Sequence, residues 1–104
     1  MCKRKIKVKI CIGGECHTLQ VELHPRGCMR ATRTHIDIPE AEAPPLFRDA
    51  ASNRGVRFSW IRVGDCLVLY APGLPDVKIC GPIPEPRGPL LLRRLKRGVL
   101  YLGL

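Results

Sequence analysis

Amide side chains are almost missing from this 104-residue chain, which holds one glutamine, Gln20, and one asparagine, Asn53. Serine is nearly as rare, with two residues, whereas the chain contains twelve arginines and ten prolines. Amides are lost on prolonged heating and proline stiffens loops, so this composition is typical of proteins from hyperthermophiles. Intracellular proteins of such organisms can contain disulfides, so the six cysteines do not require an extracellular location.

Negative charge is also scarce. Nine Asp and Glu residues oppose eighteen Lys and Arg residues, which gives a formal net charge of +9, and the excess is spread along the chain. A surface charged only for thermal stability would balance the two signs. The imbalance therefore indicates a polyanionic partner.

Long apolar runs are missing as well. The longest uncharged apolar stretch, residues 66–74, has the length of a strand, far below the roughly 18–20 residues that a membrane span needs. Met1 is followed by Cys2, Lys3, Arg4 and Lys5 with no apolar leader behind them, so we expect a cytoplasmic protein without membrane association. A chain of this length excludes a multidomain enzyme and predicts one domain spanning residues 1–104.

The first two strands can be aligned residue by residue. Residues 5–12 alternate between lysine or cysteine and isoleucine or valine, and residues 15–23 alternate in the same way after Gly13 and Gly14. A two-residue glycine turn sets partners whose numbers sum to 27. This register places Cys11 opposite Cys16 in a pair that lies close enough for a cross-strand disulfide.

The rest of the chain predicts an α+β fold. We expect one layer of mostly antiparallel sheet built from hairpins, with two short helices, in the order ββ-β-α-βββ-α-β. The further strands are expected at residues 30–38, 56–63, 66–70, 76–80 and 99–102, and the helices at residues 45–54 and 89–97.

The cysteines predict three disulfides that brace this single domain. A loop centred on Gly73 pairs Leu69 with Val77 and brings Cys66 opposite Cys80. Cys2 and Cys28 remain, and the first hairpin carries position 2 to within three residues of Cys28. By loop-closure entropy the three bridges contribute about 2 to 3.5 kcal/mol each to the free energy of unfolding.

Two other uses of the same cysteines stay open. Cys11, Cys16, His24 and Cys28 lie in one 18-residue stretch and offer an alternative zinc-binding module, although no second tight cysteine pair supports it. Cys28 near His24 is the one candidate for a cysteine nucleophile.

Catalytic motifs are not found. Acidic residues are few and scattered, no phosphate-binding glycine loop occurs, and no histidine has a carboxylate at a spacing that suggests a catalytic dyad. We interpret His17 as a half-buried packing residue, His24 as part of a proline turn and His35 as part of a basic strand. The expectation is a protein that is not an enzyme, with no catalytic residue, metal or cofactor.

The basic residues form three sets, and we expect them to bind the phosphates of a nucleic acid, with RNA favoured. Because the chain has few aromatic residues, phosphate contacts would outweigh base stacking. An acidic protein surface is the alternative partner, which would make the chain an interaction subunit. Alternating lysines on an edge strand lie about 7 Å apart, near the phosphate spacing of a nucleic-acid strand. The three sets are Lys3, Lys5, Lys7 and Lys9 on the first strand; Arg26, Arg30 and Arg33; and Arg93, Arg94, Lys96 and Arg97 on the last helix.

Two resemblances add to this interpretation. With its six cysteines, arginine-rich surface and missing amides, the whole chain resembles small three-disulfide proteins of hyperthermophilic crenarchaea, which implies no particular activity. Residues 74–79, Leu-Pro-Asp-Val-Lys-Ile, with the later strand 99–102, are similar to the C-terminal strands of THUMP domains. That resemblance covers a small part of the chain and implies RNA binding without catalysis.

Overall fold

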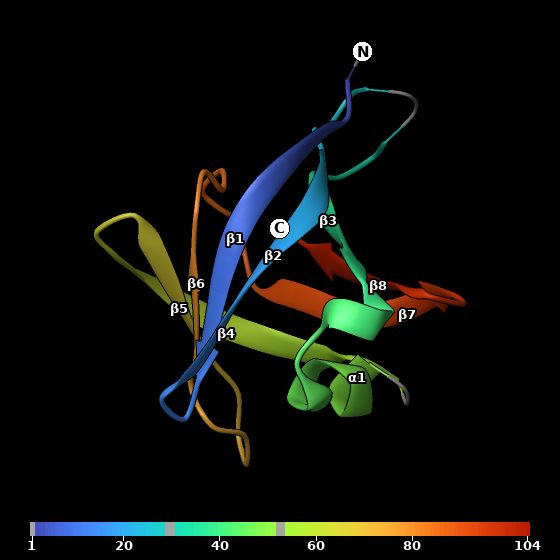
Figure 1. Cartoon of the computed structure of the whole chain (residues 1–104). Coiled ribbons are helices and arrows are strands. Elements are labelled where there is room, and N and C mark those ends of the chain that lie inside the picture. Colours follow the sequence, from blue (N-terminus) through green and yellow to red (C-terminus); the bar gives the residue numbers. More distant parts are fainter. Residues whose placement is uncertain (1, 29–30, 52–53) are drawn as a thin grey trace.

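Eight antiparallel strands close into a barrel in the computed structural model, which describes residues 2–28, 31–51 and 54–104 (Figure 1). The strands follow one another around the ring in the order β1-β2-β3-β8-β7-β4-β5-β6, and β6 pairs again with β1. The strands are β1 (Arg4–Ile12), β2 (Glu15–His24), β3 (His35–Pro39), β4 (Val56–Val63), β5 (Cys66–Tyr70), β6 (Val77–Cys80), β7 (Leu90–Lys96) and β8 (Val99–Gly103).

The closed ring corrects the predicted open sheet. Strand β1 pairs with β2 along one side and with β6 along the other, so it is not the edge strand that its alternating lysines suggested. The pairing of β1 with β6 covers only Lys9–Ile12, so Lys9 lies inside the paired sheet, whereas Lys5 and Lys7 lie on the half of β1 that pairs with β2 alone. Protection of an open edge can therefore explain Lys5 and Lys7 but not Lys9.

The prediction of a second helix is wrong. Residues 89–97 were expected to be helical, but β7 spans Leu90–Lys96 and pairs with both β4 and β8. Leu90 and Leu92 are buried inside the barrel, whereas Leu95, expected on the inner face of a helix, is 53% exposed. The apolar residues of a run this short fit both the helical repeat of 3.6 residues and the strand repeat of two. Pairing with β4 and β8 makes this segment a strand.

The helical segments lie together between β3 and β4. A 3-10 turn, η1 (Glu40–Glu42), occupies the predicted linker, and the helix α1 (Pro45–Ala51) is shorter than the predicted 45–54. Helix α1 packs against β7 and β8 at one end of the barrel, and its Phe47 joins the barrel core (Figure 1). Within the described residues no helix has the length and hydrophobicity needed to cross a bilayer.

The barrel interior is filled by alternate side chains from all eight strands. Along β1, Ile6, Val8 and Ile10 point inward and are buried, while the lysines between them are exposed. The predicted register of the first hairpin is confirmed at every pair from Arg4–Leu23 to Ile12–Glu15. Gly13 and Gly14, with φ of 58° and 87°, make the expected turn, because these angles strain other residues.

Strand β3 is shorter than predicted. The expected strand 30–38 begins only at His35, because the chain bends at Thr32 and Arg33 after the preceding turn. Arg30 lies outside the described residues. Strand β3 pairs with β2 and β8, and this pairing sets what lies beside its two polar residues, His35 and Asp37.

All six cysteines form disulfides, in the predicted pairing Cys2–Cys28, Cys11–Cys16 and Cys66–Cys80. The two cross-strand bridges join directly opposed residues whose Cα atoms lie 4.0 Å apart. In this structure the sulfurs of Cys11, Cys16 and Cys28, which the alternative zinc site and the cysteine nucleophile would use, are held in disulfides.

Candidate functional surfaces

The outer surface of the barrel is where ligands can bind, because side chains fill its interior. Two outer regions differ from an ordinary polar surface. One spans β1, β6, β5 and β4, and the other spans β2, β3 and β8 on another side of the ring.

The first region combines lysines with exposed apolar side chains, and we call it the cationic–apolar face. Lys9 lies beside Cys80, and Lys78 lies beside Val68, across paired strands. Val68 in turn lies beside Ile61. The face consists of Lys7, Lys9, Lys78, Ile61, Val63, Val68 and Tyr70, around the outer disulfides Cys11–Cys16 and Cys66–Cys80.

The apolar members of this face are unusually exposed. Ile61 is 51%, Val63 50% and Tyr70 42% exposed, and among the described residues only Leu95 joins them as an exposed large hydrophobic residue. None of the outward residues that pair across β1–β6, β6–β5 and β5–β4 is acidic. Asp65 borders the face at the β4–β5 turn, where its Oδ1 lies 3.6 Å from Cys66 Sγ. An exposed apolar patch with a polar, charged border is typical of a binding surface.

The second predicted basic set is partly tied into the fold. Arg33 donates from Nε to the Leu104 carbonyl oxygen at 2.9 Å and from Nη2 to the Pro89 carbonyl oxygen at 2.8 Å. Both contacts hold the loop before β3 against the end of the chain and the start of β7. Arg26 is exposed, and its main-chain N–H donates to Thr34 Oγ1.

The third set lies on the β7–β8 hairpin instead of on a helix. Strand β7 is four places from β1 in either direction around the ring, so the first and third sets occupy opposite walls of the barrel. Arg94 forms two contacts with Glu40, and the Arg93 guanidinium lies 5.7 Å from the centre of the Tyr101 ring. Lys96 and Arg97 are exposed at the tip of the hairpin.

The first and third sets each contribute one residue to a single groove. Lys5 of β1 and Lys96 of β7 both border an open groove of about 430 Å³, together with the acidic side chains of Glu22, Asp37 and Glu42. Because acidic and basic groups alternate here, this groove lacks the uniform positive charge of the cationic–apolar face. The predicted basic sets therefore do not merge into a single patch.

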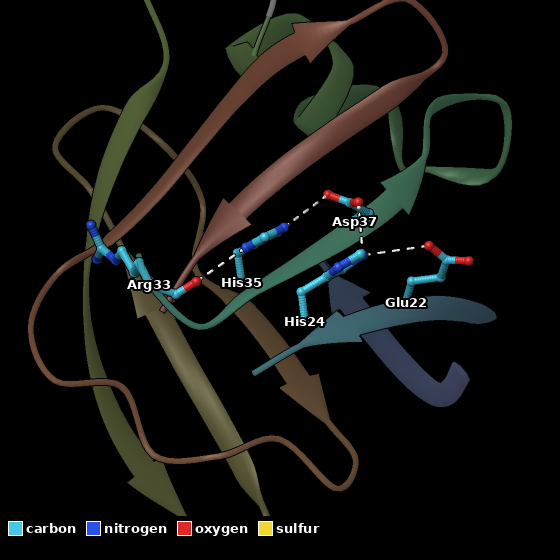
Figure 2. A network of polar contacts seen from close by, with 5 residues as sticks. All are labelled: Glu22, His24, Arg33, His35 and Asp37. Carbon is cyan, nitrogen blue, oxygen red and sulfur yellow. Dashed lines mark hydrogen bonds and ion pairs between the residues drawn. The ribbon is translucent and has the colours of Figure 1, made fainter. Parts of the chain in front are cut away.

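The second unusual region is a cluster of two histidines and two carboxylates, which Figure 2 shows in close view. We call His24, Glu22, His35 and Asp37 the histidine–carboxylate cluster. Nε2 of His24 lies 3.1 Å from Asp37 Oδ2 and 3.4 Å from Glu22 Oε1. Nε2 of His35 lies 3.7 Å from Asp37 Oδ1, so the two oxygens of one carboxylate face two imidazoles.

Ring stacking holds this cluster across the strands. The His24 and His35 rings lie 4.6 Å apart and within 5° of parallel, and Tyr101 of β8 lies 4.7 Å from His35 on its other side. The registers explain the arrangement, because His24 pairs with His35, and Asp37 pairs with both Glu22 and Tyr101.

The sequence analysis missed this cluster. The expectation that no histidine has a carboxylate at a spacing suggesting a dyad overlooked Glu22 with His24 and His35 with Asp37, which are two residues apart on strands and share a face. The two-residue spacing within each strand could be recognised in the sequence, whereas the register between β2 and β3 could not. His17, expected to be half-buried, has a side chain that is 53% exposed, near Glu15.

Comparison with protein-family models, with curated proteins and with solved structures found no match. The three disulfides of the first resemblance are present in the structure. The local similarity to THUMP domains stays a prediction, as does the crenarchaeal origin.

Proposed function

We propose that this protein is a non-catalytic module that binds single-stranded RNA on its cationic–apolar face. The observation that supports this proposal best is the row that joins Lys78 through Val68 to the exposed Ile61. A second row joins Lys9 through Cys80 and Cys66 to the exposed Val63, and neither row contains an acidic residue. The proposal keeps the predicted partner and two lysines of the first predicted set, Lys7 and Lys9, and adds Lys78 and Tyr70.

The lysines supply the contacts to the backbone. Lys9 and Lys78 are diagonal neighbours on adjacent strands, since Lys9 pairs with Cys80, two residues from Lys78. Diagonal neighbours in an antiparallel sheet lie roughly 7–8 Å apart, a separation that suits successive phosphates of an extended strand. Within the described part of the chain, neither lysine has a carboxylate within ion-pair distance, so their charges remain available.

The apolar side chains supply a surface for bases. Tyr70 presents a ring on the same face, and Ile61 and Val63 extend the apolar area toward the β4–β5 turn. A base stacked on an aromatic ring contributes about 1–3 kcal/mol, independent of its identity. Because bases in a duplex are already stacked on one another, this arrangement favours a single strand.

The binding experiment measures fluorescence anisotropy of a labelled ten-nucleotide oligoadenylate RNA as protein and salt are varied. With three phosphates neutralised, affinity is expected to fall about twentyfold between 50 and 200 mM salt. The variant Lys7→Glu/Lys9→Glu/Lys78→Glu is expected to lose binding. Tyr70→Ala should weaken binding about tenfold, whereas Tyr70→Phe should retain it, because the phenylalanine ring still stacks.

A matched control keeps the net charge of the triple variant. Arg26→Glu/Arg93→Glu/Arg97→Glu changes the charge by the same amount on other parts of the barrel, and should leave most of the affinity. Equal losses in both variants would contradict a defined face. Failure of the unmodified protein to bind RNA at 50 mM salt would overturn the proposal and favour the alternative of an acidic protein partner.

A further inference from the structure

The histidine–carboxylate cluster contains two nitrogen atoms whose environment calls for a cation. His35 Nδ1 lies 3.2 Å from the Arg33 carbonyl oxygen, as Figure 2 shows. A carbonyl oxygen only accepts hydrogen bonds, so Nδ1 carries the proton. In the neutral imidazole, Nε2 then keeps a lone pair, and this atom faces Asp37 Oδ1 at 3.7 Å. A lone pair turned toward a carboxylate is stable only with a positive charge nearby.

His24 presents the same situation more strongly. Its Nε2 is buried, and it has no hydrogen-bond partner among the described residues although carboxylate oxygens lie 3.1 and 3.4 Å away. The atoms are close enough, but they are not aligned for a hydrogen bond. A buried polar atom without a partner is rare and costs free energy. A cation between the imidazole nitrogens and the carboxylate oxygens would give Nε2 of both His24 and His35 a favourable partner.

The separations fit a metal ion. Zn²⁺ binds imidazole nitrogen and carboxylate oxygen at about 2.0–2.1 Å, and the ligand atoms of a tetrahedral site are then about 3.3 Å apart. The contacts from Asp37 to the two imidazoles measure 3.1 and 3.7 Å, and the ligand atoms of His24, His35 and Asp37 all lie within 4.8 Å of one another. Ligating histidines commonly donate their other N–H to a backbone carbonyl, as His35 does to Arg33.

We propose that His24, His35 and Asp37 bind a divalent transition-metal ion of the zinc class, with Glu22 beside the fourth position. Imidazole ligands favour zinc, nickel, copper or iron over magnesium and calcium, which prefer oxygen alone. The stacked rings must turn about their side-chain bonds so that both lone pairs point at one ion. Binding therefore separates the His24 and His35 rings, which lie parallel in this structure.

The site opens onto a space that a ligand of the metal could occupy. Asp37 and Glu22 border the groove of about 430 Å³, which Lys5 and Lys96 also line. A small anion bound to the metal would have these two ammonium groups on the same groove. The proposed RNA face lies on β1, β6, β5 and β4, so the metal site is separate from it.

The experiment is isothermal titration of the oxidised protein with Zn²⁺ alone. We expect one ion per chain, and we expect His24→Ala, His35→Ala and Asp37→Asn each to weaken binding at least a hundredfold. The matched control is His17→Ala, which removes an exposed histidine that also has a nearby carboxylate and should bind Zn²⁺ unchanged. Circular dichroism of each variant without metal checks folding, and Asp37→Asn serves if a histidine variant fails to fold.

Spectroscopy gives a second readout. Histidine side-chain NMR should show the Nε2 signals of His24 and His35 shifting on addition of Zn²⁺, with the His17 signals unchanged. Absence of Zn²⁺ binding would overturn the proposal, as would equal binding by all variants or loss of binding in His17→Ala alone. If both imidazoles are doubly protonated at neutral pH and no ion binds, the missing positive charge is a proton.

Discussion

Arg94 and Glu40 are joined by two parallel contacts, Nε to Oε1 at 3.0 Å and Nη2 to Oε2 at 2.8 Å. The pair ties the β7–β8 hairpin to the 3-10 turn that follows β3. Both side chains are about one third exposed. One of the arginines expected to bind nucleic acid therefore has a structural partner within the fold.

Glu40→Gln should lower the free energy of unfolding by about 0.5–1 kcal/mol, because a partly exposed bidentate pair contributes a modest amount that salt screens. Chemical denaturation at low and high salt measures this loss, which should shrink as salt rises. Glu42→Gln alters the same turn without an ion pair to a described residue, and should leave stability unchanged. A salt-independent loss in Glu40→Gln would show that the pair does not act through charge.

Removal of each disulfide should destabilise the barrel by an amount that grows with the logarithm of the length of the loop it closes. By chain entropy, serine pairs at Cys2 and Cys28, at Cys66 and Cys80, and at Cys11 and Cys16 should cost about 3.5, 3 and 2 kcal/mol. The sequence separations of 26, 14 and 5 residues set this order. Guanidinium unfolding of the three double variants tests it, and a largest loss for the Cys11–Cys16 pair would contradict the entropic explanation.

Gly103→Ala should disturb the stack beside the histidine–carboxylate cluster. A Cβ at this position would lie 2.9 Å from Tyr101 Cε1 and 3.3 Å from Arg33 Nε, so the Tyr101 ring must move away from His35. We expect a loss of about 1 kcal/mol from overpacking and a shift of the His35 ring signals in NMR. Gly88→Ala is the control, since its Cβ would meet nothing within 4 Å. An unchanged Tyr101–His35 contact in Gly103→Ala would refute this view.

Two leucines of β7 distinguish the observed strand from the predicted helix. Leu90 is fully buried whereas Leu95 is 53% exposed, so Leu90→Ala should cost about 2–5 kcal/mol and Leu95→Ala less than about 0.5 kcal/mol. A helix over residues 89–97 would instead bury Leu95. Denaturant unfolding of the two variants separates the alternatives, and a large loss in Leu95→Ala would contradict the strand.

Local patterns were sufficient for the two hairpins whose strands alternate clearly on both sides of a glycine turn. The Gly13–Gly14 turn and the alternation on either side determine the register of β1 and β2, and the same reasoning pairs β5 with β6. The pairs Cys11–Cys16 and Cys66–Cys80 followed from these registers, and Cys2–Cys28 was the pair that remained. The residues 90–96 were misassigned because a short leucine and arginine run contains too few turns to distinguish helix from strand.

The sequence predicted part of the cationic–apolar face and none of the histidine–carboxylate cluster. The lysines of β1 could be assigned to one outer face, but Lys78 and Tyr70 join them only through the pairing of β1 with β6 and of β6 with β5. The histidine–carboxylate cluster depends on the register of β2 with β3, across a long connection that no turn motif specifies. Pairing between distant segments depends on the whole fold, because many registers satisfy the same alternation.

By itself, the sequence determined the net positive charge, the inward and outward faces of most strands, and the three covalent bridges, since each depends on composition or on neighbours near in the chain. The tertiary structure alone decided that the sheet closes, that residues 90–96 complete the ring, and that two histidines meet one carboxylate. Closure and the long-range registers follow from packing all the inward side chains into a single core, and no short segment contains that information.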